Sequence, residues 1–138
     1  MSRVVVIDTE TTGVKYLDGH RIIELAAVEI IDGKISKNNF FHYRINPEGR
    51  KITPGAKKVH GISDEQLINS PTFKDIAEEF IDFLSGAHLT TYNLNFDFGF
   101  LQAELDRAGL DVVLKRDFES SCLINHLANR YCVRLKGV

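Results

Sequence analysis

The sequence predicts a single α/β domain, and three observations lead to this prediction. A run of four β-branched residues at positions 4–7 predicts a central strand that is buried on both faces. An Asp32-Gly33 dipeptide lies between two β-rich apolar runs and predicts a tight hairpin. Apolar residues recur at helical spacing over residues 73–84 and 94–108, which predicts two amphipathic helices. With 138 residues, of which 43% are apolar, the chain is long enough to bury one core.

The predicted elements place three strands before any helix. These three strands are expected over residues 4–7, 21–32 and 35–45, and a fourth strand, after the first helices, over residues 89–92. Alternation along the third strand puts Phe41, Tyr43 and Ile45 on one face. Helices are expected to begin near Ser63, Thr72, Asn93 and Asp117, and the apolar side of the last one consists of Leu123, Ile124, Leu127, Ala128 and Tyr131.

The first strand ends in carboxylates. Asp8 and Glu10 project to the same side while Thr9 faces away, and the Cα atoms of the two acids lie only ~7 Å apart. Two such carboxylates repel each other unless a cation or a proton lies between them, and we favour a divalent metal ion over solvated acids at an exposed strand end. Asp97, in the first turn of its helix, is directed toward the strand ends as a third carboxylate. The alternative role for Asp97 is a helix N-terminal acid that interacts with the helix dipole.

Other charged residues leave alternatives open. Glu24 lies among apolar residues of the second strand, and we expect it to point to solvent rather than to support the acidic strand end. Residues 46–61 are expected to form a loop, which is either a solvated lysine-rich segment or a contact surface for a phosphate backbone. Its basic residues are Arg50, Lys51, Lys57 and Lys58.

The charge balance and hydropathy exclude some classes of protein. The net charge is −2, so the chain lacks the global basic field of a non-specific DNA coat. A nucleic acid would therefore bind locally, with metal ions offsetting the phosphate charge. No apolar run approaches the length of a membrane span, and the first strand follows Met1 without a signal peptide. We therefore expect a cytoplasmic protein that has no membrane partner.

Four motifs resemble a known superfamily. They are VIDTETTG at residues 6–13, RIIELAAV at 21–28, VHGI at 59–62 and NLNFD at 93–97. They occur in the same order as in the DEDD superfamily of 3′-to-5′ exonucleases, and the chain looks most similar to the epsilon-type proofreading subunits of bacterial DNA polymerase III. The resemblance implies a ribonuclease-H-like fold, in which antiparallel hairpin strands and a parallel strand form a mixed sheet flanked by helices.

The same resemblance implies a two-metal mechanism. Asp8 would bridge two Mg²⁺ or Mn²⁺ ions ~3.5 to 4 Å apart, with Glu10 on one ion and Asp97 supporting the other. The catalytic residues would then be these three acids, and the products nucleoside monophosphates released from a single-stranded or frayed DNA 3′ end. By position, His60 looks like a contact to the terminal nucleotide. Thr11, Asn93 and Phe96 resemble positions that form the substrate pocket and its scaffold in this superfamily. The resemblance also implies that the chain has a DNA polymerase catalytic subunit as a partner.

The chain departs from the superfamily at its end. Superfamily members carry a late His, the general base, followed five residues later by an Asp that is the fourth metal ligand. Here Tyr131 stands five residues after His126, and no Asp or Glu follows Glu119. We therefore expect residues 1–138 to form a single exonuclease-type domain that is C-terminally incomplete, truncated before the last motif and nearly inactive.

Two consequences of this departure remain open. An incomplete domain would leave apolar sheet surface uncovered, which predicts self-association. The alternative to a truncated exonuclease is a catalytically incomplete homologue that serves as a polymerase- or nucleic-acid-binding module. Two smaller departures are Gly55, where the epsilon subunit has a substrate-contacting Glu, and Tyr92, which replaces a His.

Overall fold

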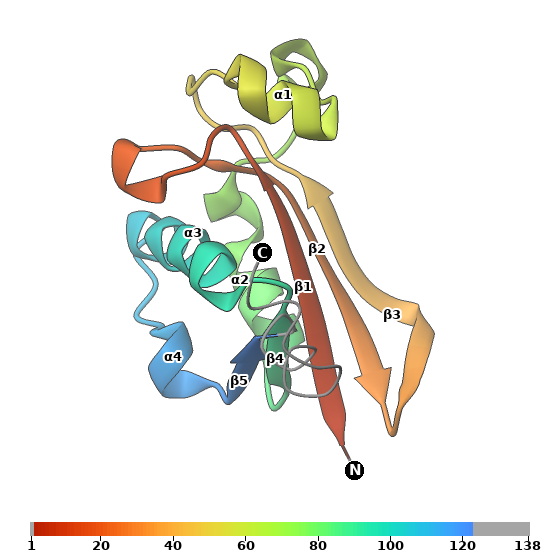
Figure 1. The fold of residues 1–138 in the computed structure, drawn as a ribbon. Helices are drawn as coiled ribbons and strands as arrows, with labels where there is room; N and C mark the ends of the chain where they lie inside the picture. The colour runs from red at the N-terminus through yellow and green to blue at the C-terminus, as the bar shows by residue number, and fades with distance from the viewer. Residues whose placement is uncertain (1, 123–138) are drawn as a thin grey trace, which may run out of the picture.

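A computed structural model describes residues 2–122 and contains one five-stranded sheet with the strand order β3-β2-β1-β4-β5 (Figure 1). The strands are β1 (Arg3–Thr11), β2 (Ile22–Ile31), β3 (Lys34–Arg44), β4 (His88–Thr91) and β5 (Ser120–Cys122). β1, β2 and β3 pair antiparallel, whereas β4 runs parallel to both β1 and β5. The expected mixed sheet is therefore confirmed, with β1 at its centre.

The hairpin between β2 and β3 is also confirmed. Asp32 and Gly33 both have positive φ angles, 49° and 84°, as a two-residue type I′ turn requires. The pairing of β2 with β3 shifts register between Val28 and Ile30, which marks a β-bulge. This bulge changes which residues of the two strands face each other.

Helices α2 and α3 cover one face of the sheet. The helices are α1 (Pro54–His60), α2 (Phe73–Leu84), α3 (Leu94–Arg107) and α4 (Leu114–Asp117), with 3₁₀ turns η1 (Tyr16–Asp18) and η2 (Asp64–Leu67). The core between helices and sheet contains Val5, Ile7, Leu25, Ala27 and Phe41 from the strands and Phe73, Phe80, Phe98, Leu101 and Leu105 from the helices. In Figure 1, both helices lie on the same side of the sheet. Within residues 2–122, every helix is too short or too polar to span a lipid bilayer.

The one-sided cover corrects the expectation for the first strand. Val5 and Ile7 face the helices and are buried, but Val4 and Val6 on the opposite face are only half-buried. The apolar run therefore packs mainly on one face. The caps of α2 and η2 are as predicted: Thr72 N donates to Asp75 Oδ2 at 3.0 Å, and Ser63 N donates to Gln66 Oε1 at 3.0 Å.

Two segments differ from the sequence prediction. The expected loop over residues 46–61 contains α1, which Thr53 caps by accepting from Ala56 N at 3.1 Å and which ends at Gly61 with φ 74°. The expected helix from Asp117 does not begin there. Instead, α4 ends at Asp117, and the chain extends into β5, where backbone pairing with β4 satisfies its polar groups. The apolar side predicted for that helix, together with His126, lies outside the described residues.

Candidate active site

Asp8 and Glu10 lie at the carboxyl end of β1, on the sheet face opposite α2 and α3. Their side chains point to the same face, as predicted, whereas Thr9 between them is buried against the helices. Partial desolvation raises the pKa of both carboxyls above the ordinary value. The neighbouring charge of Asp8 raises the pKa of Glu10 further, and Glu24 acts on both acids. The strand end is thus a region of negative potential that favours a cation or a proton.

Asp97 reaches the same strand end from the first turn of α3. Its side chain is buried, and Thr9 Oγ1 donates a hydrogen bond of 2.7 Å to Asp97 Oδ1. The pKa of Asp97 lies above its ordinary value, mainly because the carboxyl is buried. The hydrogen bond from Thr9 lowers this pKa and the charge of Asp8 raises it, so the two effects oppose each other. Asn93 caps the helix by accepting from Phe96 N at 3.4 Å, which orients the turn that carries Asp97. The three predicted acids therefore share one electrostatic environment.

The arrangement of these acids fits an open metal site rather than a closed cage. Within the described part of the chain, no three His, Cys, Asp or Glu side chains converge closely enough to enclose an ion by themselves. Mg²⁺ usually binds through one or two carboxylates and completes its shell with waters and substrate phosphates. Two carboxylates on one face and a third beside them provide this kind of donor set.

Glu24 does not point freely into solvent as expected. It lies directly opposite Glu10 in the pairing of β1 with β2, and its side chain is 24% exposed. His42 Nε2 lies 2.9 Å from Glu24 Oε2, and Arg44 Nε lies 3.5 Å from the same oxygen. Glu24 therefore belongs to the acidic strand end, which was the alternative interpretation, and its partners on β3 hold it there.

A cavity of about 330 Å³ opens beside Glu10. Its lining consists of Thr9, Glu10, Thr11, Gly13, Val14, Gly55, Ala56, Val59, His60 and Phe96. The structure thus brings together three of the four predicted substrate-binding residues, Thr11, His60 and Phe96. Asn93 does not line the cavity and acts as the cap of α3. Val14 and Val59 are 75% and 84% exposed and give the cavity an apolar rim.

His60 is fixed in orientation by the backbone. Its Nδ1 accepts from Ile62 N at 3.0 Å, so the hydrogen is assigned to Nε2, which donates to Thr11 O at 3.1 Å. Both ring nitrogens are therefore engaged. His60 presents its ring to the cavity as a rigid wall and not as a free proton acceptor.

A buried ion pair that the sequence reading missed connects the helix of Asp97 to β2. Arg21 Nη2 lies 2.8 Å from Glu104 Oε1, Arg21 Nε lies 3.0 Å from Oε2, and Ile22 N donates to Oε2 at 3.0 Å. Glu104 is only 1% exposed. A carboxylate within an otherwise apolar helix stripe could have signalled this pair, because a buried charge requires a partner.

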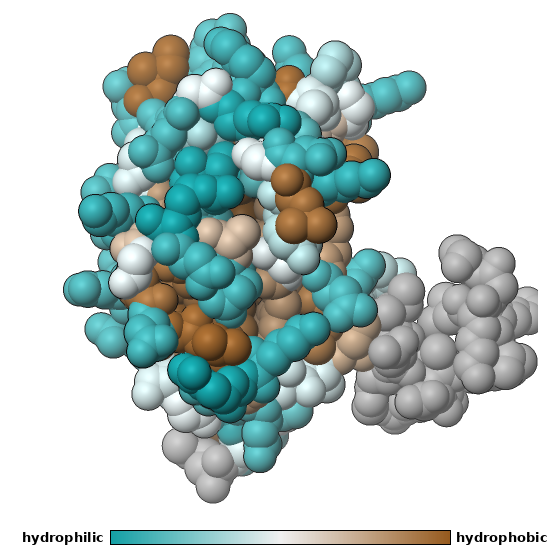
Figure 2. Space-filling view, turned by 90° about the vertical axis from the view of Figure 1, so that its left-hand side faces the viewer, coloured by the Kyte–Doolittle hydropathy of each residue, from teal (hydrophilic) through white to brown (hydrophobic). Residues whose placement is uncertain are grey.

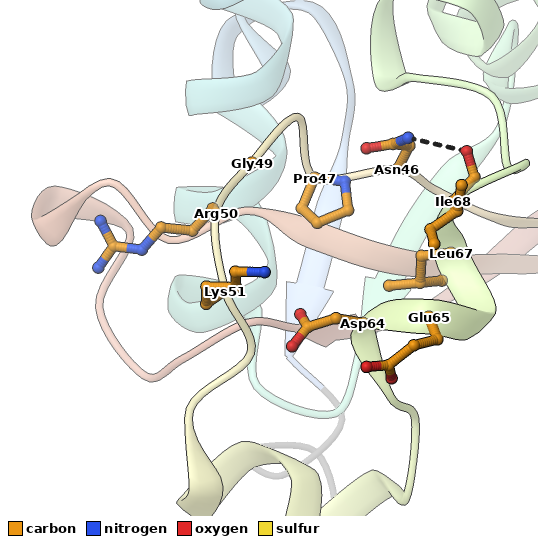
Figure 3. Close-up of a pocket in the computed structure, with 9 residues that line it drawn as sticks. All are labelled: Asn46, Pro47, Gly49, Arg50, Lys51, Asp64, Glu65, Leu67 and Ile68. Carbon is orange, nitrogen blue, oxygen red and sulfur yellow. Dashed lines mark hydrogen bonds between the residues drawn. The ribbon is translucent and has the colours of Figure 1, made fainter.

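The basic residues of the segment 46–61 divide into two groups. Arg50 Nη2 lies 3.1 Å from His20 Nε2, and Lys51 borders a cavity of about 250 Å³ that Asp64 and Glu65 also line. Figure 3 shows Lys51 and Asp64 facing this space, while Arg50 points away from it. Arg50 is therefore engaged by His20, and Lys51 borders a cavity that also contains carboxylates. Lys57 and Lys58 are exposed on the last turn of α1, where the phosphate-contact interpretation still applies.

Comparison with known proteins identifies relatives of the chain. A family model for exonucleases of the RNase T type matches residues 5–129. The DNA polymerase III subunit epsilon of Escherichia coli is 42% identical over 121 residues, covering 85% of this chain and 46% of that protein. The subunit epsilon of Pasteurella multocida is 44% identical over 115 residues, covering 80% and 45%. The chain spans about half the length of these relatives.

Solved structures share the fold. E. coli exonuclease I in complex with a dA16 oligonucleotide superposes with a TM-score of 0.84 and 18% identity, covering 100% of this chain and 32% of that one. The nuclease domain of 3′hExo, a DEDDh family member bound to rAMP, gives 0.79 and 20% identity, covering 98% and 73%. These likenesses agree with the predicted ribonuclease-H-like architecture. The family match extends over all four sequence motifs, and the chain therefore belongs to the exonuclease family.

Proposed function

We propose that this chain is a metal-dependent 3′-to-5′ exonuclease of the proofreading type, acting on single-stranded or frayed DNA 3′ ends. The observation that carries the proposal is that Asp8 and Glu10 end β1 beside a cavity of about 330 Å³, where Asp97, held by Thr9, acts electrostatically on Glu10. The similarity to bacterial epsilon subunits supports the substrate class. The products would be nucleoside monophosphates.

Each part of the site has a role in this reaction. The donor set of Asp8, Glu10 and Asp97 would hold two Mg²⁺ or Mn²⁺ ions, with Thr9 keeping Asp97 in place. When bound, such ions activate a water and stabilise the leaving 3′ oxygen. Phe96 and His60 form the walls that orient the terminal nucleotide, and the exposed Lys57 and Lys58 offer contacts to phosphates of the strand.

The catalytic rate of the 138-residue polypeptide should be low. None of its residues after Glu119 is an Asp or a Glu, and His126 has no Asp five residues later. General-base catalysis typically contributes ~10²- to 10⁴-fold, so a chain without that base should be correspondingly slow. The second candidate function is a homologue that binds nucleic acid or a polymerase without cleaving it.

Partners follow from the relatives and from the surface. Because the similar proteins are named as subunits of DNA polymerase III, we propose a DNA polymerase catalytic subunit as a partner and the cytoplasm as the location. Ile35 and Phe40 on β3 are 66% and 61% exposed, and we propose self-association through this apolar sheet surface. Gel filtration over a range of concentrations tests it: association that Phe40→Ser abolishes supports the proposal, and a concentration-independent monomer contradicts it.

The decisive experiment measures Mn²⁺-dependent shortening of a 5′-labelled single-stranded oligonucleotide. Asp8→Ala should abolish the shortening, whereas Asp82→Ala, which removes an exposed carboxylate on α2, should not. Equal shortening by wild type and Asp8→Ala would contradict the proposed site. If the oligonucleotide binds in an Mn²⁺-dependent manner but stays intact even after a segment with the late His and Asp is appended, the binding-module candidate is supported instead.

A further inference from the structure

A second cavity, of about 370 Å³, lies on the other side of the first turns of α3. It is lined by Tyr16, Asn95, Phe98, Gly99, Gln102, Val113, Leu114 and Lys115. These residues come from η1, α3 and the start of α4, which lie together at the left of Figure 1. Figure 2 views the molecule from this side and shows apolar surface exposed between polar side chains. The lining contains no carboxylate, unlike that of the cavity beside Glu10.

The ring of Tyr16 is held in this cavity by contacts with Gly99 and Phe100 of α3. A Cβ atom built at Gly99 would overlap Cε1 of Tyr16, so the ring occupies a notch that only a glycine leaves. Tyr16 meets Phe100 edge to face, with the ring centroids 5.9 Å apart and the planes at 68°. The residue remains 37% exposed. Tyr16 is thus a fixed aromatic surface with access to solvent.

A row of three aromatic side chains connects the two cavities, with Phe100 buried between Phe96 and Tyr16. Phe96 lines the cavity beside Glu10 and lies 5.0 Å from Phe100, centroid to centroid, and Phe100 in turn contacts Tyr16. Asn95 and Phe96 are consecutive residues of α3, and they line different cavities. A strand that leaves the first cavity therefore has only the first turn of α3 to cross before it reaches the second.

The polar groups of the second cavity suit a nucleotide. Lys115 is exposed, and its Nζ lies 3.5 Å from Asn95 Oδ1, so an ammonium and an amide lie together at this cavity. The amide of Gln102 is already committed, because it accepts from Leu114 N at 2.9 Å and donates to Val112 O at 2.8 Å. An aromatic surface that stacks a base, with a lysine that contacts a phosphate, is the usual chemistry of single-strand binding.

We propose that this cavity binds a second nucleotide of the same single strand whose 3′ end occupies the cavity beside Glu10. The base stacks on Tyr16, and Lys115 contacts the backbone phosphate. The inference rests on the proposed function, because it assumes that a nucleic-acid strand is the ligand. It adds a subsite that makes affinity depend on strand length.

The test measures the affinity of a fluorescent oligothymidylate with hydrolysis-resistant phosphorothioate linkages, in Mn²⁺, beside that of thymidine monophosphate. Tyr16→Leu keeps bulk in the Gly99 notch but removes the π-face, and it should weaken the oligonucleotide roughly five- to hundredfold. Tyr16→Phe should bind like wild type, and thymidine monophosphate should bind all three proteins equally. Lys115→Gln should lower the slope of log affinity against log salt by about 0.7, the value for one phosphate contact. The matched control Lys74→Gln, at an exposed lysine of α2, should leave the slope unchanged.

The outcomes separate this inference from the proposed function. If wild type binds the oligonucleotide but Tyr16→Leu and Lys115→Gln bind it equally well, the second subsite is wrong and the proposed function stands. If Tyr16→Leu weakens the mononucleotide as much as the oligonucleotide, Tyr16 belongs to the first cavity and the inference is again wrong. If wild type binds no nucleic acid at all, both fail. Lys115 is exposed, so its variant remains informative even if Tyr16→Leu folds poorly.

Discussion

The hydroxyl of Thr9 and the carboxylate of Asp97 form a buried hydrogen bond of 2.7 Å that joins β1 to α3. Thr9 faces away from Asp8 and Glu10, so the threonine between the two acids has a role of its own. It connects the third acid to the strand that carries the other two. This explains how a residue that points into the helix layer contributes to a site on the opposite face.

Thr9→Val removes this bond and keeps the volume of the side chain. The buried carboxylate of Asp97 then loses a donor, and the free energy of unfolding should fall by about 1–3 kcal/mol. Urea denaturation measures the change. Thr9→Ser retains the hydroxyl and should recover most of the loss. A Thr9→Val protein as stable as wild type would show that the bond does not hold Asp97.

Glu24 and Arg44 should affect metal affinity in opposite directions. Glu24 faces Glu10 across the sheet, and Arg44 Nε lies 3.5 Å from its carboxylate. Removing the negative charge with Glu24→Gln should weaken Mn²⁺ binding about three- to tenfold at low salt, and Arg44→Gln should strengthen it. Isothermal titration calorimetry measures both constants, with Glu78→Gln on the exposed side of α2 as a neutral reference. A shift of both variants in the same direction would contradict the electrostatic explanation.

The buried pair of Arg21 and Glu104 should dominate the stability of the region around α3. Their side chains are 12% and 1% exposed, so Glu104→Gln leaves the buried guanidinium with only the half-exposed carboxylate of Glu48, 3.3 Å away. The expected loss is about 3–5 kcal/mol in the free energy of unfolding. The double variant Arg21→Met with Glu104→Leu removes both charges and should lose less than the two single variants together. Additive losses in chemical denaturation would mean that the two side chains do not act as a pair.

Glu29 should contribute to acid sensitivity. The hydrogen bond from Arg3 Nε, at 2.5 Å, lowers the pKa of Glu29 to about 2, and Ser36 Oγ adds a second donor at 2.8 Å. The folded-state pKa lies below the unfolded value of about 4.5. The stability from this group is therefore complete above pH 4.5 and is lost as the pH falls toward 2. Thermal unfolding between these pH values should show a shallower acid dependence for Glu29→Gln than for wild type. Equal slopes of melting temperature against pH for the two proteins would show that Glu29 does not cause the acid sensitivity.

The sequence patterns predicted those elements whose signals are local. The Asp32-Gly33 turn, the cap at Thr72 and the alternation of Asp8, Thr9 and Glu10 each depend on a few neighbouring residues, and the structure agrees with all three. The position of Asp97 beside the strand end also agrees, because a helix that follows β4 starts at the same edge of the sheet as the end of β1.

The remaining features depend on pairing that no local pattern specifies. A regular hairpin would place Glu24 opposite Phe41, but the bulge after Val28 moves it opposite Arg44 and beside the acids. β5 forms because β4 offers it a free edge, and the residues of β5 carry no strand pattern of their own. α1 was signalled only by Thr53, Pro54 and Gly61, since its seven residues include no buried side chain.

The hydrogen bond between Thr9 and Asp97 also bears on the order of folding, since its partners are separated by 88 positions in the chain. The β2–β3 hairpin brings together close neighbours and should form within about 1–10 μs, whereas the parallel pairing of β1 with β4 must first close a long loop. During synthesis, Asp8 and Glu10 leave the ribosome well before Asp97 exists. The cluster of acids consequently forms only when the domain is nearly complete, and a nascent or partly unfolded chain has no assembled acid cluster with which to carry out the proposed reaction.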